Sequence, residues 1–363
     1  NYRTNVYGSL LTTQQPFNVE IEPNFGEPDY EVTFKPENAS DLANALTFPS
    51  SAEIQINGNL DASGLSPEDF ELPAAKKIVI ADDATLIMPS SAYFTTSQDL
   101  TIEGGTITNE STTRAAGDPS EDGSKGIFRI YGGNFTLDGV TVINDMNYHF
   151  HGKTTNSAAI AYWNDANINI TNSTIKSGEF ALCGMGRGVA SGVITLKDSY
   201  FESTSSSANN GKNWSYTLRI FGTSGTADNC TVKGIQGGLS TDSGIKFTIN
   251  SGLYYTVNSE GKTDAFYPVY VTNGSTVTIN GGYFYGAMKR ANVAGMDGNS
   301  CVVSGDNDVN LHSGSIILNG GYFNGKAYNH VTNKLYELAS PFQYQACNVE
   351  KDGMWFTWEV VKN

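Results

Sequence analysis

The chain has 363 residues, of which 39 are glycine and only 16% are charged. Its formal net charge of −15 excludes nucleic acid as a partner, because contact with phosphates needs a basic surface. No apolar run approaches the roughly eighteen residues that cross a membrane, so we expect no transmembrane segment. Turn-forming residues are abundant among β-branched and aromatic ones, which predicts an all-β protein with many short strands.

The N-terminal part of the chain, residues 1–36, carries no repeat. Within it, NVYGSLL and FNVEIEPNF predict strands that belong to, or lead from, a preceding domain. From Ser40 to Leu46 a helix-capping residue is followed by apolar residues at helical spacing, which predicts a short helix. Such a helix would cover the first coil of a repeat structure, whose open strand edges would otherwise pair with other chains.

One phrase recurs through residues 37–325 and is clearest in VTINGGYFYG (277–286) and IILNGGYFNG (316–325). Apolar and polar residues alternate, a turn rich in Asn, Asp and Gly follows, and a second apolar stretch comes after the turn. The last apolar residue before each turn serves as an anchor for alignment. The anchors lie 22 to 39 residues apart, at Ile56, Ile80, Ile102, Leu137, Ile170, Leu196, Ala227, Ile249, Ile279 and Leu318.

This repeat selects a solenoid among the all-β architectures. A propeller blade needs about forty residues and four strands, and a sandwich would not repeat one inward pattern so regularly. In a parallel β-helix each coil lays its strands on those of the coil before, so equivalent residues stack in columns and loops of variable length leave the corners. We therefore predict a parallel β-helix of about ten coils.

The C-terminal part, residues 326–363, is aromatic and alternating, which predicts strands that close the far end of the solenoid. Trp355, Trp358 and Val360 are the residues expected to point inward. The chain thus divides into leader strands (1–36), a β-helix (37–325) and a C-terminal cap (326–363). Its cysteines, Cys183, Cys230, Cys301 and Cys347, leave both disulfides and free thiols open.

Two features carry a resemblance to a known group. The opening NYRTNVYGSLLTTQQPFNVEIEPNF resembles the segment that leads into the helix domain in surface proteins of gut Bacteroidales. Coils such as TINGGYFYG resemble the right-handed parallel β-helix domains of that group, within the pectin-lyase-like superfamily. The resemblance implies an adhesin-like extracellular protein, lipid-anchored to the outer membrane through a segment missing from this sequence, or secreted. It implies no particular activity, because the superfamily holds lyases, hydrolases and adhesins.

Motifs for catalysis or metal binding are weak. Asp242, His151 and Arg219 stand alone, without the longer phrases found around such residues in polygalacturonase-type hydrolases. Asp306 and Asp308 alternate in GDNDVN and are weak candidates for Ca²⁺, and a polar loop between coils is the favoured interpretation. We therefore predict no catalytic residue and no cofactor.

One column is more suggestive. Eight or nine residues before the anchors, Arg and Tyr recur and predict an outward ladder along one face of the rod. Aromatic rings stack on sugar rings, and guanidinium groups clamp carboxylates or sulfates through two hydrogen bonds. Outward Arg and Tyr are also ordinary strand residues that pair with nearby acids, so a purely structural role is the alternative. The candidate ligand-binding residues are Arg129, Tyr162, Arg187, Arg219 and Tyr270, flanked by Trp163 and Trp214.

The favoured function is therefore a non-catalytic, adhesin-like protein of the cell surface that binds a polysaccharide or a host or cell-surface glycan along one long face. The first alternative is a polysaccharide lyase or glycoside hydrolase acting on an acidic glycan. The second is a structural stalk that displays a partner domain.

Overall fold

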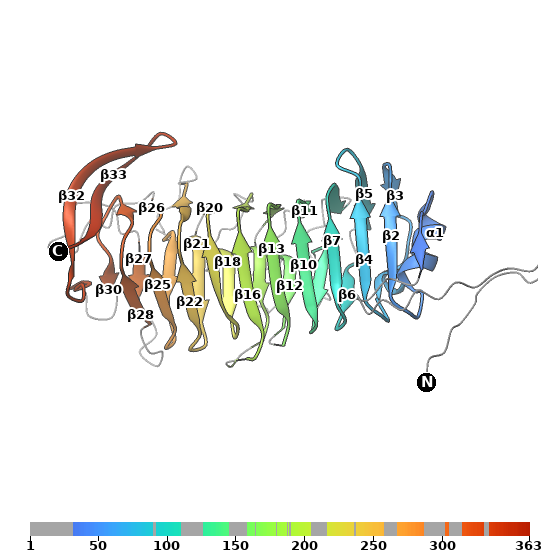
Figure 1. Ribbon diagram of the computed structural model, residues 1–363, viewed down its shortest axis with the longest axis horizontal. Helices are drawn as coiled ribbons and strands as arrows, with labels where there is room; N and C mark the ends of the chain where they lie inside the picture. Colours follow the sequence, from blue (N-terminus) through green and yellow to red (C-terminus); the bar gives the residue numbers. More distant parts are fainter. Residues whose placement is uncertain are drawn as a thin grey trace, which may run out of the picture.

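The computed structural model describes residues 32–89, 92–109, 126–144, 158–163, 165–178, 180–186, 188, 190–204, 216–235, 237–257, 267–286, 302–304, 314–329 and 334–363. These residues form an elongated rod of short strands, with a helix at one end and a long hairpin at the other (Figure 1). Strands of three sheets follow one another in turn along the chain, and neighbours within each sheet are parallel through the body of the rod. The predicted parallel β-helix is therefore confirmed.

Sheet A holds the anchor residues. Its strands, in spatial order, are β1 (Thr33–Phe34), β2 (Ala52–Ile56), β4 (Lys76–Ile80), β7 (Leu100–Glu103), β10 (Asn134–Asp138), β13 (Asn167–Thr171), β16 (Val193–Lys197), β19 (Ser224–Asp228), β22 (Lys246–Ile249), β25 (Thr276–Ile279) and β28 (Ser315–Leu318).

Sheet B follows sheet A around each coil and also receives the C-terminal hairpin. Its strands, in spatial order, are β3 (Leu60–Asp61), β5 (Thr85–Met88), β8 (Thr106–Asn109), β11 (Thr141–Asn144), β14 (Thr174–Ser177), β17 (Tyr200–Ser203), β20 (Cys230–Gly234), β23 (Gly252–Thr256), β26 (Tyr283–Tyr285), β29 (Tyr322–Phe323), β33 (Met354–Lys362) and β32 (Phe342–Lys351).

Sheet C completes the coil before the chain returns to sheet A. Its strands, from the N-terminal end of the rod, are β6 (Phe94–Thr96), β9 (Phe128–Ile130), β12 (Ala158–Tyr162), β15 (Phe180–Gly184), β18 (Tyr216–Phe221), β21 (Gly237–Asp242), β24 (Val269–Val271), β27 (Val302–Ser304), β30 (Tyr328–Asn329) and β31 (Lys334–Leu335).

The anchors stack as the repeat predicts, with one exception. They are buried on sheet A, and pairs such as Ile249 with Ile279 and Ile279 with Leu318 are register partners. Ile102, however, pairs with Ile78 and not with Ile80. A shift of two residues keeps the same face inward, because strand side chains alternate with a period of two. The inward residues of all three sheets thus build one hydrophobic core along the rod.

The Asn-Gly-Gly phrase forms the corner between sheets A and B. Gly282 and Gly321 adopt φ values of 108° and 110°, which side-chain-bearing residues rarely tolerate. A Cβ on Gly282 would also lie 2.9 Å from the carbonyl oxygen of Gly252 in the preceding coil. The amide Nδ2 of Asn319 donates to Oδ1 of Asn280, and that of Asn280 donates to Oδ1 of Asn250, both at 2.9 Å. The phrase recurs because this corner and its amide ladder recur.

The predicted helix at the N-terminal end is confirmed as α1 (Ala39–Leu46). Its cap is Asn38 rather than Ser40: the Asn38 side chain accepts a hydrogen bond from the main-chain N–H of Asp41 at 3.0 Å. Leu42 and Leu46 are buried in the core that α1 covers. A single 3₁₀ turn, η1 (Pro67–Phe70), contacts this helix. No helix among the described residues is long and apolar enough to span a membrane.

The C-terminal cap is antiparallel, with β33 paired to both β29 and β32. Val360 is buried and Trp358 packs against the core, as predicted. The prediction for Trp355 is wrong: its side chain is 51% exposed, because its neighbour Phe356 takes the buried side of the strand. Cys183, Cys230 and Cys347 are free thiols, and Cys301 lies outside the described residues.

Candidate binding surfaces

The outer face of sheet C carries the predicted arginine column. Register pairs connect Arg129 to Ala161, Ala161 to Cys183, and Cys183 to Arg219 on successive strands. The same column continues through Ser240 to Tyr270. Arg129, Arg219 and Tyr270 therefore do share one column, as the spacing from the anchors indicated.

Tyr162 does not belong to that column, so its predicted outward position is wrong. Its register partner is Ile130, its ring is fully buried in the main core, and its hydroxyl donates to the carbonyl oxygen of Phe221 at 3.3 Å. Burial raises the pKa of this hydroxyl well above its usual range. The cause is corner length: four residues separate β12 from β13, whereas three separate β9 from β10. Counting back from the anchor therefore lands one residue too late in this coil.

Tyr270 lies in the column but offers no ring to a ligand. Only 4% of it is exposed, and it stacks on Tyr216 and Tyr267 with ring centroids 5.8 Å apart in both cases. With Tyr328 these rings form a separate buried cluster on sheet C. Two further candidates, Arg187 and Trp214, lie outside the described residues, as do the weak Ca²⁺ candidates Asp306 and Asp308. Within the described part of the chain, no three His, Cys, Asp or Glu residues come together as metal ligands.

Both described arginines of the column lie on aromatic rings. The guanidinium carbon of Arg129 is 3.8 Å from the ring centroid of Tyr93, and that of Arg219 is 4.1 Å from the ring of Phe221. No residue in the described part of the chain forms a salt bridge or hydrogen bond with either guanidinium, and Nε of Arg129 is buried without a hydrogen-bond partner. Three strand spacings separate the two arginines, a distance of about 14 Å.

Trp163 lies beside this column, as predicted, and stacks on Tyr131 with ring centroids 4.2 Å apart. Tyr131 was not a candidate, although it stands two residues after Arg129 and strand alternation places it on the same face. It is 41% exposed, so a ligand can reach its ring.

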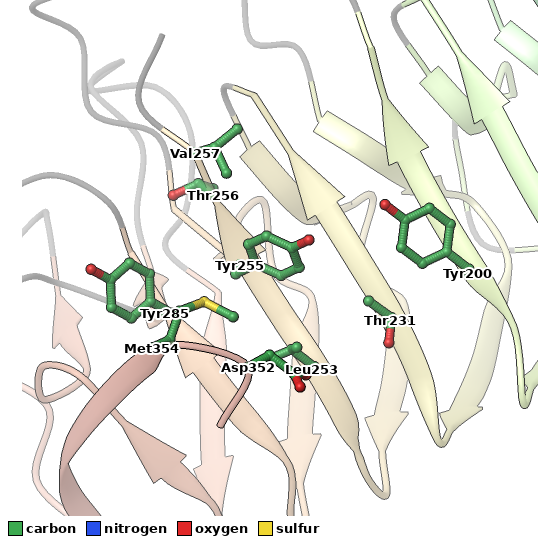
Figure 2. A pocket seen from close by; sticks show the side chains of 9 residues that line it. All are labelled: Tyr200, Thr231, Leu253, Tyr255, Thr256, Val257, Tyr285, Asp352 and Met354. Carbon is green, nitrogen blue, oxygen red and sulfur yellow. The ribbon is translucent and has the colours of Figure 1, made fainter. Parts of the chain in front are cut away.

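A second surface, on the outer face of sheet B, was not predicted. A groove of about 680 Å³ is floored by residues of β17, β20, β23 and β26, and walled by the turn that joins β32 to β33 (Figure 2). Figure 2 shows the rings of Tyr200 and Tyr255 pointing toward one another, while Met354 and Asp352 reach in from the hairpin. The lining residues are Tyr200, Thr231, Leu253, Tyr255, Thr256, Val257, Tyr285, Asp352 and Met354.

A charge cluster in which two lysines share one glutamate lies next to this groove. Glu202, the register partner of Lys233, contacts the Nζ atoms of Lys233 at 2.7 Å and Lys176 at 3.6 Å. Burial tends to raise the pKa of the Glu202 carboxyl, but the bonds from Lys233 and Tyr200 and the charge of Lys176 lower it overall. The pKa of Tyr200 is raised, first by burial and then by its contacts with Glu202 and Tyr255. The pKa of Lys233 is raised, mainly by its bond to Glu202, so the Glu202 carboxylate and the Lys233 ammonium remain charged at neutral pH.

Comparisons with protein-family models, with curated proteins and with solved structures find no match. The fold defines the class of the protein, a β-solenoid of the parallel β-helix type. The two surfaces must therefore be interpreted from their own chemistry.

Proposed function

We propose that the protein is a non-catalytic, adhesin-like protein that binds an acidic polysaccharide on the outer face of sheet C. The observation that supports this proposal is the pair of arginines, Arg129 and Arg219, which share one column and have no acidic partner among the described residues. In a chain with a net charge of −15, carboxylates are plentiful, so two guanidinium groups without an acidic partner among the described residues support binding of an external anion.

The stacked geometry suits such a ligand. A guanidinium that lies flat on a ring keeps its hydrogen-bond donors at its rim, where a carboxylate or sulfate can accept two of them side by side. Two such groups about 14 Å apart match a chain molecule with repeated anions better than they match a small ion. The exposed ring of Tyr131, stacked on Trp163, adds a surface for a sugar ring beside Arg129.

The resemblance of the opening segment to surface proteins of gut Bacteroidales supports a location at the cell surface. An adhesin-like protein also needs a binding face that extends away from its point of attachment, and a rod provides one. Attachment to the outer membrane through a segment beyond the present sequence is part of this proposal.

The test is retention on immobilised polygalacturonate, which carries carboxylates, and on heparin, which carries sulfates. We expect retention that weakens as salt is raised, and a loss of about tenfold in affinity for each of Arg129→Gln and Arg219→Gln, as expected for one charge-assisted bonding site. The affinity of Arg219→Lys should lie between that of the unchanged chain and that of Arg219→Gln, because lysine keeps the charge but not the paired donors. The matched control is Lys246→Gln, which removes an exposed charge from sheet A.

A variant that carries both Arg129→Gln and Arg219→Gln should be retained less than the unchanged chain, and unchanged retention would refute the proposal. The absence of retention of the unchanged chain on both polymers would also refute it. The eluted polymers are also examined for new unsaturated or reducing ends. Their appearance would replace the binding function with the lyase or hydrolase alternative.

A further inference from the structure

We propose that the groove on sheet B is a second binding site, which takes neutral pyranose sugars of a glycan chain. It lies on a different sheet from the arginine column and does not depend on the proposed function. Its volume of about 680 Å³ falls within the range of about 300–1,000 Å³ typical of small-ligand sites.

The floor of the groove provides three tyrosine rings, two of them on adjacent strands. Tyr255 and Tyr285 are register partners on adjacent strands, about 4.8 Å apart. Tyr200 stands on the far side of Thr231, and all three rings are partly exposed. The negative face of an aromatic ring attracts the weakly positive C–H bonds on the flat face of a pyranose. Adjacent tyrosines therefore form a platform for consecutive sugar rings.

The remaining lining residues complete a sugar-binding composition. Thr231 contributes a partly exposed hydroxyl, which both donates and accepts hydrogen bonds, and Asp352 contributes a carboxylate that accepts them. Leu253 and Met354 provide apolar contacts between these groups. A few polar groups among apolar and aromatic ones is the usual composition of a small-molecule site.

The charges around the groove favour a neutral ligand. The two lysines nearest to its floor, Lys176 and Lys233, are held by Glu202. At the wall, Asp352 pairs with Lys351 at 3.6 Å, so this carboxylate is also already held in an ion pair. An anionic sugar would meet the Asp352 carboxylate, and a cationic ligand would have to separate that carboxylate from its lysine.

The groove depends on the hairpin that walls it. Phe356 is fully buried against the outer face of sheet B, with its ring centroid 5.3 Å from that of Tyr283 and 6.2 Å from that of Tyr285. The turn itself is Asp352–Gly353, with φ values of 52° and 77°. Two successive positive φ values are typical of the tight two-residue turn of a β-hairpin. This turn places Asp352 and Met354 in the wall of the groove.

The experiment measures binding of cello-, xylo-, manno- and maltohexaose to the full chain by isothermal titration calorimetry. We expect at least one hexaose to bind, and Tyr285→Ala and Tyr255→Ala each to weaken that binding at least tenfold. Tyr255→Phe, which keeps the ring, should bind within about threefold of the unchanged chain. Ile317→Ala, which removes an exposed apolar side chain from sheet A, away from both surfaces, is the control and should have no effect.

Asp352→Asn is a variant that should fold normally. The Asp352 side chain is 62% exposed, and asparagine tolerates the positive φ at this position. We expect it to weaken hexaose binding while the thermal unfolding temperature stays constant.

The proposal would be overturned if the substitutions at Asp352, Tyr255 and Tyr285 left the affinity for the hexaose unchanged. It would also be overturned if none of the four hexaoses bound. Tetramethylammonium serves as a probe for a cation site, and its binding in place of the sugars would also overturn it. Arg129→Gln and Arg219→Gln should leave hexaose binding unchanged, so failure at either surface is distinguishable from failure at the other.

Discussion

Lys76 occupies an inward position on sheet A that apolar residues fill in later coils. Its register partner Leu100 pairs in turn with Phe135, and both are buried. Lys76 is fully buried as well, and its ammonium donates to the carbonyl oxygens of Phe48 and Ser50, both at 2.9 Å. These bonds join β4 to the segment between α1 and β2. One lysine thereby ties the N-terminal cap to the solenoid.

The pH dependence of stability tests this arrangement. Burial lowers the pKa of Lys76 from 10.5 to about 8. Between these values the unfolded chain holds a proton that the folded chain has lost, so the contribution of Lys76 to stability rises with pH in this window. Urea unfolding gives the unfolding free energy of the unchanged chain and of Lys76→Met. The value for the unchanged chain minus that for the variant should rise by roughly 1–2 kcal/mol from about pH 7 to about pH 9.5. A difference that is constant, or that falls, would show that the lysine is not desolvated.

Within the C-terminal hairpin, one face of β33 packs on sheet B and the other faces solvent. Phe356 packs on Tyr283 and Tyr285, whereas Trp355 on the next position faces solvent and is 51% exposed. The hairpin both extends sheet B through β33 and folds back over its outer surface. Figure 1 shows it as the long curved pair of strands at the C-terminal end.

Phe356→Ala should detach the hairpin tip and destabilise the protein by about 3–5 kcal/mol, the usual cost of removing a buried phenylalanine ring. Trp355→Ala removes a larger ring from the exposed face and should cost only about 0.5 kcal/mol. Chemical denaturation gives both values, and hydrogen exchange across β32 and β33 should increase in the first variant alone. Equal effects of the two substitutions would contradict the packing described for this hairpin.

At the scale of the whole molecule, the repeat made the coils and their columns predictable. Alternation and turn residues are local signals, and they identified the anchors, the outward position of Arg129 and Arg219, and the helix at the N-terminal end. Corner length is not visible in such a pattern, and one extra residue after β12 moved Tyr162 into the core. In the hairpin, alternation places Phe356 on the same face as Trp358 and Val360, so the prediction that Trp355 also points inward broke the period of two.

The groove could not be predicted from the sequence, for a different reason. Tyr200, Tyr255 and Tyr285 each look like an ordinary outward strand residue, and the wall comes from a turn at residues 352 and 353. Only stacking of the coils and folding back of the hairpin bring them together. The repeat predicts the first event, because Tyr255 and Tyr285 each stand six residues after an anchor, whereas the second leaves no local sequence signal.

Pairing of each coil with its neighbours also determines how the rod should unfold under a stretching force. In the body of the rod each strand is hydrogen-bonded to strands of the coils before and after it, so a load applied to the two ends of the chain meets one coil at a time. The anchors lie 22 to 39 residues apart, so each coil that gives way should release roughly 75–130 Å of extended chain. Single-molecule stretching should therefore record a staircase of unequal steps in that range, whereas one cooperative rupture would show that the coils yield together. For a surface protein, such a staircase would let an attachment lengthen under flow before it breaks.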